Sequence, residues 1–277
     1  MSRAPITLHP IPPGATPALA DAEARLPKDA VPDKEDLRRE LETLTERLDR
    51  LQRRLYADGG RALLVVLQGR DASGKDGTLR WVFGPLDPLG VTATSFKVPT
   101  EEELRRDFLW RIHRAVPARG TIGVFNRSHY EDVLVVRVRR LVPESVWRPR
   151  YEQINLFERH LVENGTVILK FLLHISREEQ GERLLERLHD PEKYWKFNAG
   201  DLAERELWDE YTAAYREMLQ RTSTAAAPWY VVPADSKRVR DVLVARTVVE
   251  TLERVDPQWP GPPPELEALR GALDPGR

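Results

Sequence analysis

The chain alternates between short apolar runs and longer amphipathic segments. Five short runs rich in apolar or β-branched residues predict β-strands, at residues 62–68, 91–96, 121–126, 166–174 and 229–233. Between and after them, apolar positions recur at three- and four-residue steps and predict helices, over 75–84, 101–115, 128–137, 149–163, 177–188, 201–221 and 236–253. Strands that alternate with helices in this way predict an α/β fold, with a parallel sheet whose two faces are covered by helices.

An amphipathic stretch also precedes the first strand. Asp33 is a preferred N-cap residue and predicts a helix that runs to about Tyr56. Its leucines recur at alternating steps of four and three residues, at Leu37, Leu41, Leu44, Leu48, Leu51 and Leu55. Such a narrow apolar stripe suits packing on the helix's own domain or contact with a second subunit, and the pattern leaves both open.

Proline-rich segments flank this pattern on both sides. Residues 1–32 are rich in Pro and Ala, and we expect them to be extended, wrapped on the domain or disordered. The tail, 256–277, contains a further group of prolines and is expected to be an irregular surface segment. We therefore predict one domain over residues 33–255, between the segments 1–32 and 256–277.

Composition narrows the class of protein. The chain has 277 residues, no cysteine and a formal net charge of −1, from 43 basic and 44 acidic residues. The absence of cysteine excludes disulfides and thiolate metal sites. The balanced charge argues against a nucleic-acid partner, so that any phosphate affinity must come from local clusters of cations. No apolar run reaches the roughly 18–20 residues that span a bilayer, and the N-terminus lacks the pattern of a secretory signal. We expect a cytoplasmic protein with no membrane partner.

The first predicted strand ends in a glycine-rich turn that opens the next helix. The turn, Gly69-Arg70-Asp71-Ala72-Ser73-Gly74-Lys75-Asp76-Gly77, follows the pattern of a phosphate-binding loop. Its glycines let the backbone curl so that successive N–H groups face anionic oxygens, and the helix N-terminus adds a partial positive charge. Lys75 is placed to reach a bridging or terminal phosphate. We therefore predict a P-loop phosphotransferase in preference to a chance glycine-rich turn.

The metal chemistry of this loop departs from the usual pattern. The residue after the lysine is normally Ser or Thr, whose hydroxyl binds Mg²⁺, but here it is Asp76. The third predicted strand ends at Asn126, where P-loop enzymes usually place an Asp that holds Mg²⁺. The missing charge must come from Asp71, Asp76 or Glu131, since one or two carboxylates with phosphate oxygens satisfy Mg²⁺. We assign Asp71 and Glu131 as metal-binding residues, with Mg²⁺, or Mn²⁺ in its place, as the cofactor.

Arg127 follows Asn126 directly. Its guanidinium is placed to neutralise charge on a transferred phosphoryl group, and the alternative is a surface ion pair. We assign no catalytic role to His129, because phosphoryl transfer depends on positioning and charge neutralisation more than on an imidazole base. The candidate catalytic residues are therefore Asp71, Lys75 and Arg127.

Two further groups of cations lie beyond this segment. Residues 187–198 lie between two predicted helices and combine three cations with three aromatic side chains, Arg187, Lys193, Lys196, Tyr194, Trp195 and Phe197. Such a segment suits a lid, over about 187–200, that closes on a base and phosphates, and the alternative is an exposed loop whose aromatics pack on the domain. The other group suits either a polyanion track or ordinary surface solvation, and it comprises Arg137, Arg139, Arg140, Arg148 and Arg150.

Several segments match one known family in combination. They are residues 68–77, 95–97, 107–111, 123–138, 190–197, 222–224 and 227–235. Together they resemble the polyphosphate kinase 2 family, the polyphosphate:nucleotide phosphotransferases, over roughly residues 35–255. The run Asn126-Arg127-Ser128-His129-Tyr130-Glu131-Asp132 is similar to the class III branch of that family.

The resemblance implies a fold and an activity. The fold is a P-loop kinase core similar to thymidylate kinase, with a helical lid. The activity is transfer of a terminal phosphoryl group of inorganic polyphosphate to a nucleotide with Mg²⁺, and class III members act on both AMP and ADP. The resemblance also implies that Asp71 and Lys75 are the functional residues of the loop and that Arg127 is the arginine at the strand end. It further implies that the cations of the lid are Arg187, Lys193 and Lys196. Arg70 departs from the Met expected at its position, as Ser73 does from Ala, and the bulky Arg70 is expected to alter nucleotide or chain-length preference.

The sequence thus predicts a kinase that uses polyphosphate to convert AMP and ADP to ADP and ATP, and that forms a homo-oligomer. Its phosphate- and nucleotide-binding residues are predicted to be Gly69, Ala72, Ser73, Gly74, Asp76, Gly77, Lys97, Asn126, Arg137, Arg187, Lys193 and Lys196. One rival is an ATP-dependent nucleoside monophosphate kinase on the same core. The other is a non-catalytic P-loop module or a nucleic-acid binder, which the carboxylates of the site disfavour because they repel a polyanion in the absence of a metal.

Overall fold

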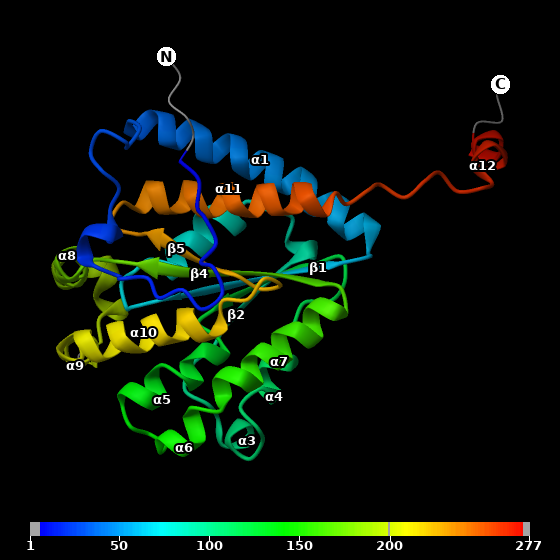
Figure 1. Cartoon of the computed structure of the whole chain (residues 1–277). Coiled ribbons are helices and arrows are strands. Elements are labelled where there is room, and N and C mark those ends of the chain that lie inside the picture. The colour runs from blue at the N-terminus through cyan, green and yellow to red at the C-terminus, as the bar shows by residue number, and fades with distance from the viewer. Residues whose placement is uncertain (1–5, 199, 274–277) are drawn as a thin grey trace.

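A five-stranded, wholly parallel sheet lies at the centre of the molecule (Figure 1). The computed structural model describes residues 6–198 and 200–273. The strand order is β2-β3-β1-β4-β5, where the strands are β1 (Ala62–Gly69), β2 (Val91–Ser95), β3 (Ile122–Asn126), β4 (Thr166–His174) and β5 (Trp229–Pro233). The five predicted strands are confirmed to within one residue at each end, and so is the α/β fold with helices on both faces of the sheet.

The central strand is β1, which is buried along its whole length. Leu67 pairs with Asn126 of β3 on one side and with Phe171 of β4 on the other. Because every strand is parallel, the carboxyl ends of β1, β3 and β4 meet at one edge of the sheet. That edge carries the glycine-rich loop after β1 and the polar segment after β3.

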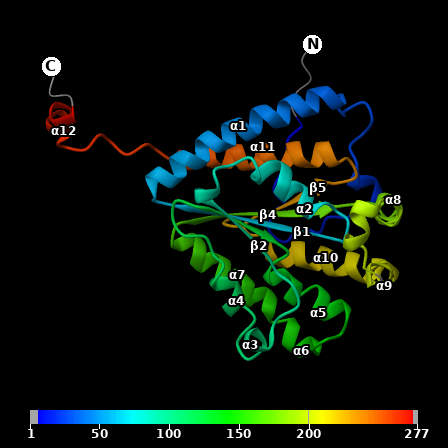
Figure 2. The ribbon, with the colours of Figure 1, turned by 180° about the vertical axis from the view of Figure 1, so that it is seen from behind.

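One face of the sheet is covered by α1 (Lys34–Asp58), α11 (Lys237–Val255) and the short helix α2 (Lys75–Thr78), which continues as a π-helical turn, η2 (Leu79–Phe83) (Figures 1 and 2). The Asp33 carboxylate caps α1, as predicted, by accepting from the backbone N–H groups of Glu35 and Asp36. The leucine stripe of α1 lies in one apolar core with α11 and the sheet. The structure therefore supports packing of this helix on its own domain.

The other face is covered mainly by α7 (Arg150–Glu163) and α10 (Trp208–Thr222). Apolar side chains of alternate strand positions, such as Leu64 and Val66, point to this second core, whereas Leu63 and Val65 point to the first. The predicted helices 149–163, 177–188 and 236–253 are confirmed as α7, α8 (Arg177–His189) and α11. Among the described residues, no helix combines the length and apolar character that crossing a membrane requires.

Three helices predicted as continuous are each divided into two elements in the structure. Residues 101–115 form two single turns, α3 (Glu101–Leu104) and α4 (Trp110–His113), because the Asp107 carboxylate bonds the Leu109 N–H and makes a turn between them. Residues 128–137 form a 3₁₀ turn, η4 (His129–Asp132), and then α5 (Val135–Val138), separated by the non-helical Leu134. Residues 201–221 are interrupted at Leu207, between α9 (Gly200–Glu206) and α10. The short elements that no pattern predicted are η1 (Asp21–Ala24), η3 (Pro88–Gly90), α6 (Glu144–Trp147) and η5 (Pro191–Lys196).

The two proline-rich ends behave differently. From Ile6 onward the N-terminal segment wraps on the domain: the Ile11 N–H donates to the Trp229 carbonyl at 2.8 Å, and Leu19 is buried in the second core. The tail runs away from the body of the molecule and ends in α12 (Leu266–Leu273), none of whose residues is buried (Figure 2). The expectation of an irregular tail is therefore wrong for this helix, whose short amphipathic run follows the prolines directly.

Candidate active site

The loop Gly69–Gly77, here called the P-loop, turns sharply from β1 into α2. Gly74 has φ +103°, and a Cβ at that position would overlap the guanidinium of Arg240, so glycine alone fits there. Ala72 has φ +63° without being a glycine, which costs about 1–2 kcal/mol. Ser73 is fully buried, and its carbonyl accepts from Arg183 and Arg240. The loop is thus held in a curled shape of the kind that cradles phosphate.

Lys75 begins α2 and points back along the loop. Its ammonium donates to the carbonyls of Gly69 at 2.7 Å and Arg70 at 3.0 Å, and the residue is only 8% exposed. Burial, reinforced by the nearby Arg127 charge, lowers the pKa of Lys75 to about 8, against the opposing pull of the Asp71 carboxylate. The structure thus places at the loop a lysine whose charge is poorly neutralised by protein groups.

This pKa predicts an alkaline limit for the enzyme. The useful form of Lys75 is the ammonium, which is present below its pKa and lost as the pH rises through about 8. Because kcat/KM reports ionisations of the free enzyme, we expect it to fall above about pH 8. The Lys75→Arg variant should lack this decline in its residual activity, since a guanidinium does not titrate there. A wild-type profile that stays flat well into the alkaline range would contradict the assignment.

Arg127 follows β3 and faces the P-loop. Its guanidinium contacts two carboxylates, through Nη2 to Asp71 Oδ1 and through Nη1 to Glu131 Oε2 at 3.4 Å. The residue has φ +62°, and its N–H donates to the Leu67 carbonyl at 3.1 Å, which fixes this strained backbone against β1. Burial opposes ionisation of Asp71, but the charges of Lys75 and Arg127 outweigh it and lower the pKa of that carboxyl. The three candidate catalytic residues therefore form one charged cluster.

The altered metal positions lie next to each other. Asn126 donates its amide N–H to Asp76 Oδ1 at 2.6 Å, so that the uncharged strand end and the loop carboxylate are joined across 50 residues. Within the parts of the chain that the structure describes, no three His, Cys, Asp or Glu side chains gather into a metal-binding group. Asp71 and Glu131 nevertheless offer hard oxygen donors on either side of Arg127, and Mg²⁺ needs only one or two carboxylates besides phosphate oxygens. The donor set fits Mg²⁺ with a phosphorylated substrate.

The lid segment keeps two of its three aromatic side chains in solvent, and Phe197 is half-buried. Tyr194 is 54% exposed and Trp195 is 77% exposed, so these two rings do not pack on the domain. Arg187 donates to Asp201 Oδ2 at 3.1 Å, and its charge reaches Asp71, where it helps to lower the carboxyl pKa. Lys193 is held at 2.7 Å by each of two neighbouring carboxylates, and the Lys196 ammonium lies 4.9 Å from the Trp195 ring centre. Residue 199 of the predicted lid lies outside the described residues.

Two predicted binding residues lie on other parts of the fold. Arg137, on α5, donates to Glu217 of α10 at 2.7 Å and is turned toward that helix. Lys97 follows β2 and lines an open pocket of about 350 Å³, a volume within the range of small-molecule sites. Trp110 lies in the same pocket, with the guanidinium carbons of Arg106 and Arg114 at 4.1 and 4.7 Å from its ring centre. The binding roles of Arg137 and Lys97 remain predictions.

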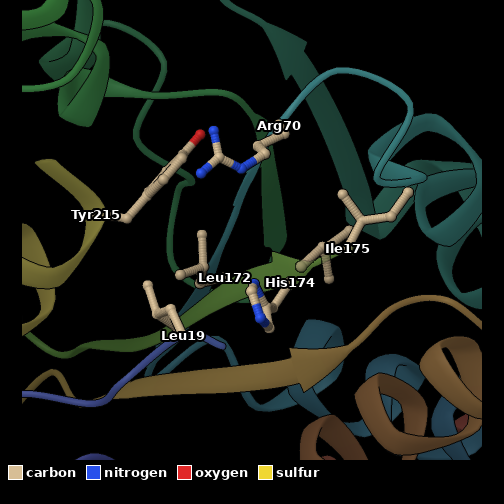
Figure 3. A pocket seen from close by; sticks show the side chains of 7 residues that line it. Leu19, Arg70, Leu172, His174, Ile175 and Tyr215 are labelled. Carbon is tan, nitrogen blue, oxygen red and sulfur yellow. The ribbon is translucent and has the colours of Figure 1, made fainter. Parts of the chain in front are cut away.

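Arg70 points away from the loop interior. Its guanidinium lies 3.8 Å from the Trp208 ring centre and donates to the Trp208 carbonyl at 2.8 Å. Figure 3 shows it turned toward Tyr215 above a small cavity lined also by Leu19 and His174. That cavity measures about 10 Å³, which is at the lower limit for a single water. Arg70 therefore joins the P-loop to α10, and no substrate-sized space adjoins it there.

The structure adds a group of residues that the sequence reasoning missed. Arg183 and Gln180 on α8, and Arg240 on α11, are buried and donate to backbone carbonyls of the P-loop. Asp241 accepts from Arg240 and also from Thr78 of α2. The available signal was a charged residue on an apolar helix face, since Arg240 precedes Leu243 and Val244 by three and four residues.

A curled loop at the end of the central strand, with a buried lysine and an arginine from the adjacent strand, places the molecule among the P-loop kinases. The chain belongs to the Polyphosphate kinase 2 (PPK2) family, whose family model matches residues 31–260. The resemblance stated from the motifs is therefore confirmed.

Relatives with curated names agree with this family. An AMP/ADP-polyphosphate phosphotransferase of Meiothermus ruber is 55% identical over 229 residues, which cover 83% of this chain and 86% of the relative. An ADP-polyphosphate phosphotransferase of Rhodopseudomonas palustris is 46% identical, over 84% of this chain and 86% of the relative. The crystal structure of polyphosphate kinase 2 from Arthrobacter aurescens is similar with a TM-score of 0.86 and 43% identity, covering 89% of this chain and 88% of that one.

Proposed function

We propose that the protein is a polyphosphate-dependent nucleotide kinase that transfers the terminal phosphoryl group of inorganic polyphosphate to AMP and ADP, giving ADP and ATP. The names of the similar proteins support these substrates. The observation that carries the proposal is the cluster at the loop, where Lys75 and Arg127 face Asp71 and Glu131. Two cations beside two carboxylates suit a site for phosphates together with a divalent ion.

In the reaction, an oxygen of the terminal phosphate of AMP or ADP attacks the end phosphorus of polyphosphate. The bond between that phosphorus and the next bridging oxygen breaks, and the chain leaves shorter by one phosphate. No strong base is required, because the attacking phosphate is already ionised near neutral pH. The main obstacle is repulsion between two polyanions. Lys75 and Arg127 lower it by neutralising the transferred group, and the P-loop N–H groups orient its oxygens.

Asp71 and Glu131 are the residues we propose for a divalent ion, which would supply charge neutralisation at the phosphate oxygens. In the described structure both carboxylates contact Arg127. Asp71 is ionised, since its pKa lies below the ordinary value. The same carboxylate is therefore able to bind the ion or to position the nucleotide phosphate through Arg127.

One assay tests the proposal against its rival. The protein is mixed with AMP, long-chain polyphosphate and Mg²⁺, and we expect ADP first and then ATP. The control replaces polyphosphate with ATP as the donor, which should give little ADP from AMP. Rapid phosphorylation with ATP and none with polyphosphate would show an ATP-dependent nucleoside monophosphate kinase instead. We further propose a cytoplasmic location and a homo-oligomer, the second being tested by the mass of the protein in solution.

We propose that residues 187–198 form a closing lid. Exchanging Arg187, Lys193 and Lys196 together for alanine should lower turnover by about 10²-fold, because the cations that neutralise the phosphates are lost. The fold should persist, since these side chains make local contacts. The measurements are turnover and hydrogen exchange of residues 187–198. In the wild type, we expect ADP and polyphosphate together to slow this exchange.

A matched control comes from α1. Arg38, Arg39 and Arg53 are also exposed cations in local ion pairs, and their partners Glu35, Asp36 and Asp49 all lie on α1 itself. Their triple alanine variant should keep the wild-type rate. If the lid variant keeps its rate and exchange in the segment ignores both ligands, the segment is an ordinary loop.

A further inference from the structure

An arginine of α8 contacts the outer side of the P-loop, in addition to Arg240 of α11. Arg183 lies on α8 and is 7% exposed. Its Nη1 donates to the Ala72 carbonyl at 2.9 Å and to the Ser73 carbonyl at 3.3 Å. These two carbonyls belong to the residues at the turn of the loop, so the guanidinium holds them facing away from the loop interior.

The rest of the same guanidinium is anchored to the body of the fold. Nη2 donates to the carbonyls of Ala234 at 2.7 Å and Asp235 at 2.8 Å, just after β5. Nε donates to Glu179 Oε1 at 2.8 Å, one turn earlier on α8. All five N–H groups of Arg183 are therefore engaged, and a planar fork is required to reach both pairs of carbonyls at once.

The orientation of these carbonyls decides what the loop offers to an anion. A peptide unit that points its carbonyl outward points its N–H inward. The Ser73 amide closes the turn by donating to the Arg70 carbonyl at 3.1 Å, and the Gly74 amide is directed to the loop interior, where an anion is bound. Ala72 holds an unfavourable positive φ of 63° to achieve this. Without Arg183, the Ala72 carbonyl loses this bond and the Ser73 carbonyl keeps only its bond from Arg240, so these peptides gain freedom to rotate and to present a carbonyl oxygen to a phosphate, which repels it.

We propose that Arg183 is a positioning residue that keeps the P-loop amides aimed at the transferred phosphate. This inference rests on the proposed role of the P-loop as the phosphate site. Arg183 touches no substrate group in this scheme and acts through the backbone of Ala72 and Ser73. The last three residues of α8, 187–189, are the first of the lid segment. Arg183 therefore also connects the helix that carries the lid segment to the P-loop.

The test exchanges the fork for a point charge. Arg183→Lys keeps the charge but cannot bridge the two pairs of carbonyls, and we expect kcat to fall by about 10- to 100-fold, with a raised KM, as small misplacements in active sites do. The matched control is Arg246→Lys, because Arg246 is a similarly buried arginine (11% side-chain exposure) that pairs with Glu40 on α1, away from the loop. That control should keep wild-type kcat and KM.

A second readout separates positioning from mere stability. Hydrogen exchange of residues 70–76 is measured with ADP and with inorganic polyphosphate, each added alone. Whichever ligand protects these amides in the wild type should protect them less in Arg183→Lys and as before in Arg246→Lys. A residue that only stabilised the fold would lower the unfolding temperature and leave this protection unchanged, which would overturn the proposal.

A milder variant keeps the test open if Arg183→Lys fails to fold. Glu179 is 26% exposed, and Glu179→Gln should reduce kcat by a few-fold through a less fixed guanidinium. Wild-type kcat and exchange in a folded Arg183→Lys, or in Glu179→Gln where Arg183→Lys does not fold, would refute the role of Arg183. If Lys75→Ala also kept its rate, the P-loop itself would not be the phosphate site; loss of activity in Lys75→Ala alone would refute only the role of Arg183.

Discussion

Replacing Lys75 with alanine is expected to reduce turnover by about 10²–10³-fold, the usual effect of removing one preorganised charge donor from an active site. The ammonium lies inside the P-loop, bonded to two carbonyls of the loop itself, and a phosphate oxygen is a stronger partner than either of them. Arg127 cannot replace it, because its guanidinium approaches from the end of β3 and is shared with Asp71 and Glu131.

The fold should survive this exchange. Lys75 is buried with a depressed pKa, so its ammonium is held in the folded protein at some cost in free energy. The measurement is turnover together with the unfolding temperature, and Lys34→Ala serves as a control because Lys34 is an exposed lysine at the start of α1. A folded Lys75→Ala enzyme with wild-type turnover would exclude the proposed mechanism.

Removing divalent ions is expected to stop the reaction. Both substrates are polyanions, and Asp71 and Glu131 add negative charge to the site where they meet. With only Lys75 and Arg127 to balance these charges, the two substrates and the carboxylates repel one another, so that a divalent cation is required.

The measurement is turnover in excess EDTA, followed by addition of Mg²⁺ or Mn²⁺ beyond the chelator. Activity should return, and the unfolding temperature of the free protein should change little on chelation, since the carboxylates are already paired with Arg127. Full turnover in metal-free buffer would mean that the carboxylates only orient Arg127.

Four of the five strands, β1, β3, β4 and β5, could be predicted from the sequence as mainly apolar runs, whereas β2 has two threonines and a serine and is the least buried strand. β1 (Ala62–Gly69) and β3 (Ile122–Asn126) are buried on both faces, and this burial explains why their residues are almost all apolar. The apolar spacing did not predict the helix breaks. Between α3 and α4, the Asp107 carboxylate stops a helix that the apolar spacing continues.

The same distinction holds for the site. The loop residues and Arg127 were predicted because each motif is contiguous in the chain, whereas the pairing of Asn126 with Asp76 needs the register of β1 against β3. Arg183 and Arg240 reach the loop from helices that lie more than 100 residues further along. A charged residue on an apolar helix face signals that Arg240 is buried, but it does not say which backbone the guanidinium contacts. Their discovery required the tertiary structure.

The N-terminal segment that wraps on the domain is expected to fold after the sheet. During synthesis on the ribosome, Ile11 is made before its hydrogen-bond partners, the Ser223 hydroxyl and the Trp229 carbonyl, which follow more than 200 residues later. Ala24 likewise bonds the backbone of Asp235. The segment therefore lacks these hydrogen bonds until the sheet has formed. It docks as a late step, after β5 has completed the edge of the sheet.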